Sequence, residues 1–156
     1  MKKILSLLSL VLTIALFVGC SALTGEEIGR LPINQVTIND ENLILKEISL
    51  ALKKNEKIGI WSDLDVQYEG DVAFRFIIEI LLNGENMSTL EIDPTEKNIT
   101  LGEVKTSIMG KTKWQFLGKN HEFTIEKDGD YTFKGLLIAS ENPTLKVTTA
   151  EVVIKK

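Results

Sequence analysis

Residues 71–83 read DVAFRFIIEILLN, and this stretch decides the fold class. Its apolar side chains recur at every second position, as in a β-strand whose successive side chains point to opposite faces. One face carries Val72, Phe74, Phe76, Ile78, Ile80 and Leu82, and the other carries Ala73, Arg75, Ile77, Glu79 and Leu81. The stretch therefore predicts a long central strand with one face in a core and the other partly covered.

The same period of two recurs more weakly along the rest of the chain. Turn residues separate the short apolar segments, among them Asn83-Gly84, Asp93-Pro94, Gly118-Lys119-Asn120 and Asp128-Gly129. Segments 130–140 and 144–155 each slip phase midway, around Gly135 and Thr149-Ala150, which predicts a β-bulge in each. Eight or nine strands with close turns predict an all-β fold, a single antiparallel two-sheet β-sandwich.

Segment 42–54 fits two patterns. It alternates as a strand would, yet Ile44, Ile48 and Leu52 also form a helical stripe with a spacing of four. We expect a strand because residues 55–57 then turn into another apolar run, and a helix remains the alternative.

The tail around residues 128–133, DGDYTF, resembles the closing strands of immunoglobulin-like or jelly-roll domains. The resemblance covers about 30 residues. In the immunoglobulin-like case it implies that the Tyr131 hydroxyl bonds back to the upstream chain as a tyrosine corner. The paired cysteines of antibody domains are absent from the sequence.

The N-terminus has the pattern of an export signal. Met1-Lys2-Lys3 is a short basic start, and residues 4–18 are an apolar run interrupted only by Ser6, Ser9 and Thr13. The run has 15 residues, whereas a membrane-spanning helix needs about 20. A signal peptide is therefore the expected reading, and a permanent transmembrane anchor is the alternative.

The run ends at residues 17–22, FVGCSA, which resembles the lipobox of bacterial lipoproteins. The resemblance implies cleavage after Gly19 and a diacylglycerol on the thiol of Cys20, with further acylation of the new amino terminus. Phe17 departs from the leucine usual in that motif. Cys20 is the chain's one cysteine, so an internal disulfide is excluded. Two or three acyl chains would hold the protein durably on a membrane, whereas an incidental cysteine in an ordinary signal peptide is the alternative.

These features predict a signal peptide at 1–19, a lipidated cysteine with a flexible linker at 20–34, and a β-sandwich at 35–156. Loss of Lys2 and Lys3 with the signal leaves 16 basic against 22 acidic residues, a net charge of −6. This balance argues against a nucleic-acid partner and against electrostatic binding to anionic lipid. We expect the domain to lie outside the cytoplasm, in the cell envelope of a bacterium.

Two aromatic residues flank the densest acidic stretch of the chain. Trp61 and Tyr68 are the better candidates for a platform that stacks on sugar rings, because Trp114 and Tyr131 fit core positions. Asp63, Asp65 and Asp71 supply carboxylate oxygens of the kind that bind Ca²⁺, although the pattern of an EF-hand loop is missing and solvated strand-edge charge is the plainer reading.

The sequence offers few residues that could act as a catalytic base or nucleophile. His121 is the single histidine and is expected in an exposed polar turn, where no nucleophile or orienting acid can be identified. A His/Cys zinc site is excluded by the same count. The sequence therefore predicts a non-catalytic binding or envelope-structural domain without a cofactor other than the covalent lipid. The partner would be a protein or a glycan. A calcium-assisted carbohydrate-binding module is the first alternative, and a carboxylate-based hydrolase is the second.

Overall fold

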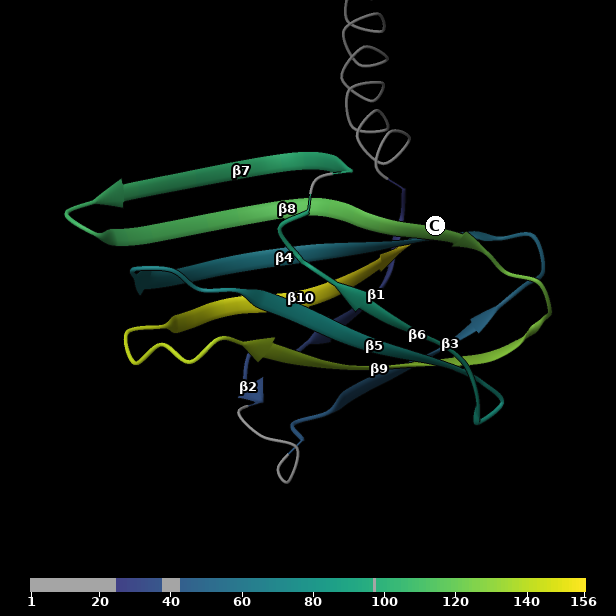
Figure 1. The fold of residues 1–156 in the computed structure, drawn as a ribbon. Coiled ribbons are helices and arrows are strands. Elements are labelled where there is room, and N and C mark those ends of the chain that lie inside the picture. The colour runs from purple at the N-terminus through teal and green to yellow at the C-terminus, as the bar shows by residue number, and fades with distance from the viewer. Residues whose placement is uncertain (1–24, 38–42, 97) are drawn as a thin grey trace, which may run out of the picture.

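The computed structural model describes residues 25–37, 43–96 and 98–156, which form two facing β-sheets (Figure 1). Sheet A has the strand order β1-β10-β4-β8-β7, and sheet B has the order β2-β9-β5-β6 with β3 also paired to β9. The described strands pair antiparallel, except that β2 runs parallel to β9. The strands are β1 (Glu27–Pro32), β2 (Val36–Thr37), β3 (Lys46–Leu52), β4 (Lys57–Glu69), β5 (Phe74–Leu82), β6 (Glu85–Ile92), β7 (Ile99–Ile108), β8 (Lys111–Thr124), β9 (Gly129–Ala139) and β10 (Lys146–Lys155). The predicted two-sheet β-sandwich is confirmed.

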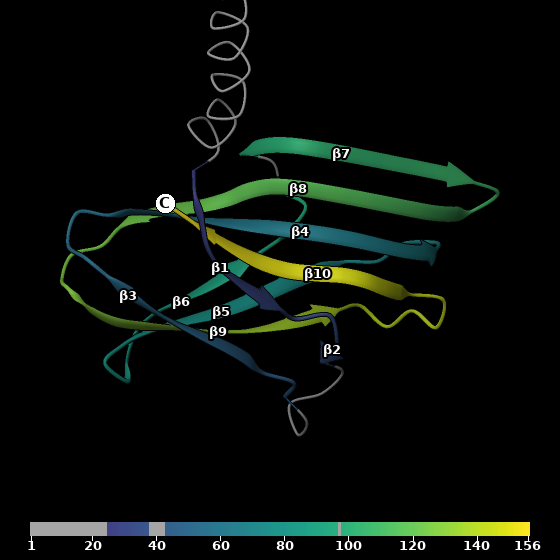
Figure 2. The ribbon, with the colours of Figure 1, turned by 180° about the vertical axis from the view of Figure 1, so that it is seen from behind.

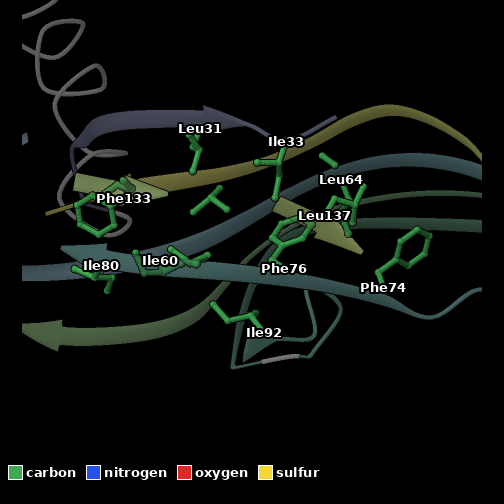
Figure 3. Close-up of a cluster of buried hydrophobic side chains, with 14 of the residues drawn as sticks. Leu31, Ile33, Ile60, Leu64, Phe74, Phe76, Ile80, Ile92, Phe133 and Leu137 are labelled. Carbon is green, nitrogen blue, oxygen red and sulfur yellow. The ribbon is translucent and has the colours of Figure 1, made fainter. Parts of the chain in front are cut away.

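The core lies between the sheets, where the period of two places it. Phe74, Phe76, Ile78 and Ile80 of β5 are all buried, as the alternation of residues 71–83 predicts. They meet apolar side chains from both sheets, and Figure 3 shows Ile60, Leu64, Phe133 and Leu137 among them. Burying a side chain of this size is worth about 1.5–3 kcal/mol relative to leaving it exposed. The two inner faces therefore account for most of the apolar burial.

The predicted boundary between linker and domain, at residue 34, lies too late in the sequence. Residues 27–32 form β1, which pairs with β10, and both Leu31 and Ile33 are fully buried. Glycine and proline at positions 25, 29 and 32 have the composition of a coil. However, Gly29 lies so close to β3 that an added Cβ would meet the Ile48 side chain at 3.0 Å. The domain therefore begins at about Glu26 instead of residue 35, and with β1 and the short β2 the described residues form ten strands.

Two local expectations about strands are confirmed. The ambiguous segment 42–54 contains strand β3, from Lys46 to Leu52. The Tyr131 hydroxyl donates a hydrogen bond of 2.9 Å to the carbonyl oxygen of Lys127, four residues upstream. This bond ties the start of β9 to the turn before it.

Of the two predicted bulges, only the one in the last strand is present. The pairing of β10 with β4 shifts between Val147 and Thr149. The bulge expected at Gly135 is wrong, because β9 pairs evenly with β5 through that residue. Gly135 faces the core, and a Cβ there would meet Leu31 Cδ2 at 2.7 Å. The glycine makes room for β1 and does not bend its own strand.

The predicted turn at Gly118-Lys119-Asn120 is also wrong, because these residues lie inside the 14-residue strand β8. The pairing of β8 with β4 shifts between Ile60 and Trp61, so the extra residue, Asn120, turns inward. Its Oδ1 accepts a hydrogen bond of 2.6 Å from the hydroxyl of Ser62. A satisfied buried amide thus replaces the expected turn.

Candidate functional site

Strand β4 separates the two aromatic residues proposed as a sugar platform. Ile58, Leu64, Val66 and Tyr68 of this strand belong to the core between the sheets. Trp61 is an odd number of positions from Tyr68 and shares the opposite, outer face with Asp63 and Asp65. Trp61 and Tyr68 therefore cannot stack on one ligand, and that prediction is wrong.

Both aromatic rings are also covered. Trp61 is 4% exposed, since its ring lies over Gly59, where an added Cβ would come within 2.9 Å of Trp61 Nε1. The Nζ of Lys155 lies 4.6 Å from the centroid of the same ring. Tyr68 is 7% exposed and packs edge-to-face on Phe74 at 6.1 Å between ring centroids. Neither ring presents an open face to solvent.

The acidic stretch is held by cations and amides of neighbouring strands. Arg30 of β1 donates hydrogen bonds to Asp63 at 2.8 Å, to Glu27 at 2.9 Å, and to Glu151 of β10. These bonds raise the pKa of Arg30, and the bond to Glu27 has the largest effect. The same bond lowers the pKa of Glu27. Arg30 thus cross-links β1, β10 and β4 on the outer face of sheet A.

Asp65 lines a shallow hollow farther along the same face. Its Oδ2 accepts a hydrogen bond of 2.9 Å from Gln115 Nε2, and its buried Oδ1 has no partner within the described residues. The hollow measures about 410 Å³ and is bordered by side chains of β4, β7, β8 and β10, including Val104, Leu117 and Thr149. A polar group of a ligand could reach Asp65 here, but the hollow is too open to exclude water from a reaction.

The three aspartates proposed for calcium are not gathered into one site. Asp63 is bonded to Arg30 and Asp65 to Gln115, while Asp71 lies beyond the end of β4, where its carbonyl oxygen accepts from Asn142. Among residues 25–37, 43–96 and 98–156, no cluster of three or more His, Cys, Asp or Glu side chains could hold a metal ion. The calcium hypothesis therefore lacks a ligand set in this part of the chain.

His121 is exposed, as expected, but it lies in β8 and not in a turn. It sits opposite Ile60 and next to the ring of Phe123, 6.2 Å away. Cys20 lies outside the described residues. No helix within the described ranges is long and apolar enough to cross a bilayer.

The sequence predicts a strand at Val104, Thr106 and Ile108, but sequence reasoning missed that this strand, β7, lies at an edge with all ten of its residues exposed. Val104 is 61% exposed and Ile108 is 64% exposed, and both lie on the outer side of sheet A, where they pair with Gln115 and Lys111. Their alternation is visible in the sequence and predicts a strand with an apolar face. Sequence alone could not tell that this face is left uncovered.

Comparisons with known proteins add little. No protein-family model matches the chain, and no curated protein matches it. A solved structure, a β-glucosidase from Paenibacillus barengoltzii, is similar over 75% of this chain and 11% of that chain, with 14% identity and a TM-score of 0.29. This chain therefore spans about a tenth of the length of that enzyme, and so low a TM-score carries no argument about fold or function.

Proposed function

We propose that the chain is a lipid-anchored, non-catalytic binding module of the bacterial cell envelope, whose domain holds an extended segment of a partner polypeptide along strand β7. The anchor rests on the lipobox-like residues 17–22 and on Cys20. The binding role rests on the edge of sheet A.

One observation carries the binding role: β7 is a ten-residue edge strand exposed along its whole length. An edge strand presents backbone N–H and C=O groups that a further strand can pair with. Partners that add a strand in this way gain affinity from main-chain hydrogen bonds and specificity from alternate side chains. On β7 those alternate side chains are Val104, Thr106 and Ile108, followed by Met109, which is almost fully exposed in the turn to β8.

The two alternatives have weaker support. A hydrolase of the carboxylate type needs one carboxyl group free to act as an acid and a second free to act as a base or nucleophile. The closest pair along β4, Asp63 and Asp65, is engaged by Arg30 and Gln115. A carbohydrate platform needs exposed rings, and Trp61 and Tyr68 are buried on opposite faces of β4.

The binding role is tested by amide hydrogen exchange of β7, measured on native membranes and on protein purified from them. We expect slower exchange of β7 amides on the membranes, because a paired partner strand protects them. The double variant Val104→Lys/Ile108→Lys should lose this protection, since charges on an edge oppose strand addition. Met87→Lys on β6 is the matched control, because Met87 is an exposed apolar residue on the edge of the other sheet. Equal exchange with and without the membranes would contradict the proposal.

The anchor is tested by the intact mass of the protein from its native membrane. We expect a chain that starts at Cys20 and carries two or three acyl chains, and we expect Cys20→Ala to lose both the cleavage and the lipid. An unmodified mature chain would overturn the anchor and leave the β7 proposal standing.

A further inference from the structure

The start of β1 and the end of β10 lie together at one end of sheet A. The backbone N–H of Glu26 donates to the carbonyl of Lys156 at 2.6 Å, and the N–H of Lys156 donates back to Glu26 at 2.9 Å. Figures 1 and 2 show β1 beginning beside the C-terminus, whereas the turn between β7 and β8 lies at the opposite end. The segment that leads back to Cys20 therefore leaves the domain at this end, which we call the tether end.

A small pocket at the tether end has four lysines in its lining. It measures about 180 Å³, and Gly25 forms part of its wall. Four of its lining residues are cations, against one carboxylate, Glu122; the cations are Lys57, Lys119, Lys155 and Lys156. This excess of positive charge is opposite in sign to the net charge of −6 expected for the mature chain.

Apolar side chains stand beside these lysines. Ile99 and Leu101, at the start of β7, line the same pocket and are both about half exposed. Trp61 also lines this pocket. Lysines next to exposed apolar side chains are the combination by which peripheral proteins bind anionic membranes, since the charges meet headgroups and the apolar groups reach the acyl boundary.

The existing ion pairs leave the lysines available to other anions. Lys119 pairs with Glu122 at 2.8 Å, and Lys156 pairs with Glu56 at 3.4 Å. The pKa values of Glu122 and Glu56 are both lowered, by the Lys119 side chain and by the Lys53 backbone N–H respectively. Ion pairs at the solvent-exposed surface contribute little to stability, so a headgroup phosphate can replace either carboxylate at little cost.

The tether is short enough to keep this pocket at the membrane. Five residue steps separate Cys20 from Gly25, and an extended chain spans at most about 3.6 Å per residue, or about 18 Å in all. A lipid on Cys20 would thus place the lysines within reach of the headgroups. We infer that the tether end docks directly on anionic phospholipid through Lys57, Lys119, Lys155 and Lys156, with Ile99 and Leu101 at the boundary. This inference rests on the proposed lipid anchor for its geometry.

The test uses a chain that begins at Ser21 and therefore has no lipid. Every residue of the core cluster lies from Leu31 onward, so this chain keeps the whole core. Headgroup binding is measured by sedimentation with two kinds of vesicle. One contains phosphatidylcholine alone, and the other also contains about 30 mol% of the anionic lipid phosphatidylglycerol. We expect binding to the anionic vesicles that weakens with salt, and much weaker binding to the neutral ones.

The variant Lys57→Gln/Lys156→Gln should bind the anionic vesicles roughly thirtyfold more weakly, because two lysines near such a surface contribute about 2 kcal/mol together. Lys111→Gln/Lys113→Gln is the matched control, since it removes two exposed lysines of sheet A at the far end. We expect that control to stay within about twofold of the wild type. Leu101→Ser should weaken binding without a change of charge.

Equal binding to the two kinds of vesicle, or equal losses in the two double variants, would overturn the inference. Neither result bears on the anchor, because this chain lacks Cys20. An acylated protein whose Ser21 chain ignores phosphatidylglycerol would keep the proposed anchor and refute the docking. An unacylated protein whose Ser21 chain binds through Lys57 and Lys156 would refute the anchor and keep the docking.

Discussion

Strands β4 and β7 both pair with β8, one on each side, yet they have opposite environments. β4 also pairs with β10, and its inner side chains lie against sheet B in the core. β7 has no second neighbour among the described strands, and all ten of its residues are exposed. Membership in a sheet is thus not the same as membership in the core. The apolar side chains of β4 stabilise the fold, whereas those of β7 remain free to meet a partner.

Truncating one apolar side chain in each strand should show the difference between β4 and β7 most clearly. Leu64→Ala in β4 should lower the free energy of unfolding by about 2–5 kcal/mol, because Leu64 is buried and its loss leaves a cavity. Val104→Ala in β7 should change it by about 0.5 kcal/mol or less, as is usual for exposed positions. Denaturant unfolding measures both values. A cost for Val104→Ala close to that for Leu64→Ala would mean that β7 is packed against something else in the native protein.

Two glycines sharpen the comparison where β7 meets β8. A Cβ on Gly118 of β8 would meet Phe116 Cζ at 2.4 Å and the Ile99 carbonyl oxygen at 2.9 Å, so Gly118→Ala should destabilise the domain by about 1–3 kcal/mol. A Cβ on Gly102 of β7 would meet nothing within 4 Å. Gly102→Ala should therefore be neutral or slightly stabilising, by up to about 1 kcal/mol. Thermal unfolding distinguishes the two, and equal effects would refute the close contact at Gly118.

The smallest effect concerns the ion cluster of Arg30, Glu27, Asp63 and Glu151 on the outer face of sheet A. This cluster lies near β1 and does not include residues of β7. The lowered pKa of Glu27 contributes stability at pH values above the ordinary glutamate pKa of about 4.3, and that stability is lost as the pH falls through the lowered value. Arg30→Met should remove this contribution, so its unfolding free energy should change less with pH between about 5 and 3. Because the cluster is about 40% exposed at Arg30 and Glu27, the difference should stay below about 1 kcal/mol.

Urea unfolding across this pH range measures the effect. Arg75→Met provides the control, because Arg75 and its partner Glu91 are both well exposed. A parallel pH dependence in wild type and Arg30→Met would contradict the assignment to Arg30 and Glu27.

Much of the fold could be predicted because alternation is local. The alternate residues from Phe74 to Ile80 could be placed inward and residues 46–52 in a strand, because both depend on nearby residues. The resemblance to immunoglobulin-like domains likewise implied the hydrogen bond of Tyr131. The sugar platform failed on information that was also local. Trp61 and Tyr68 are seven positions apart in one strand, and an odd separation places them on opposite faces.

The remaining errors came from contacts between distant segments. The role of Gly135 depends on Leu31, which arrives from β1 more than 100 residues earlier. The inward turn of Asn120 depends on Ser62 of β4. Neither partner can be identified from the residues around the glycine or the asparagine, so a bulge and a turn were the natural expectations.

By itself the sequence determined that this protein is an all-β sandwich, because the periodicity of strands depends on consecutive residues. The tertiary structure alone decided which apolar faces are covered. In it Trp61 is buried, and Asp63 and Asp65 accept hydrogen bonds from Arg30 and Gln115. Strand β7 is exposed, and four lysines line one pocket with Gly25, at the end from which the chain leads back to Cys20. The physical reason is that burial and local charge depend on which strands become neighbours, and strand order is set by the packing of the whole chain.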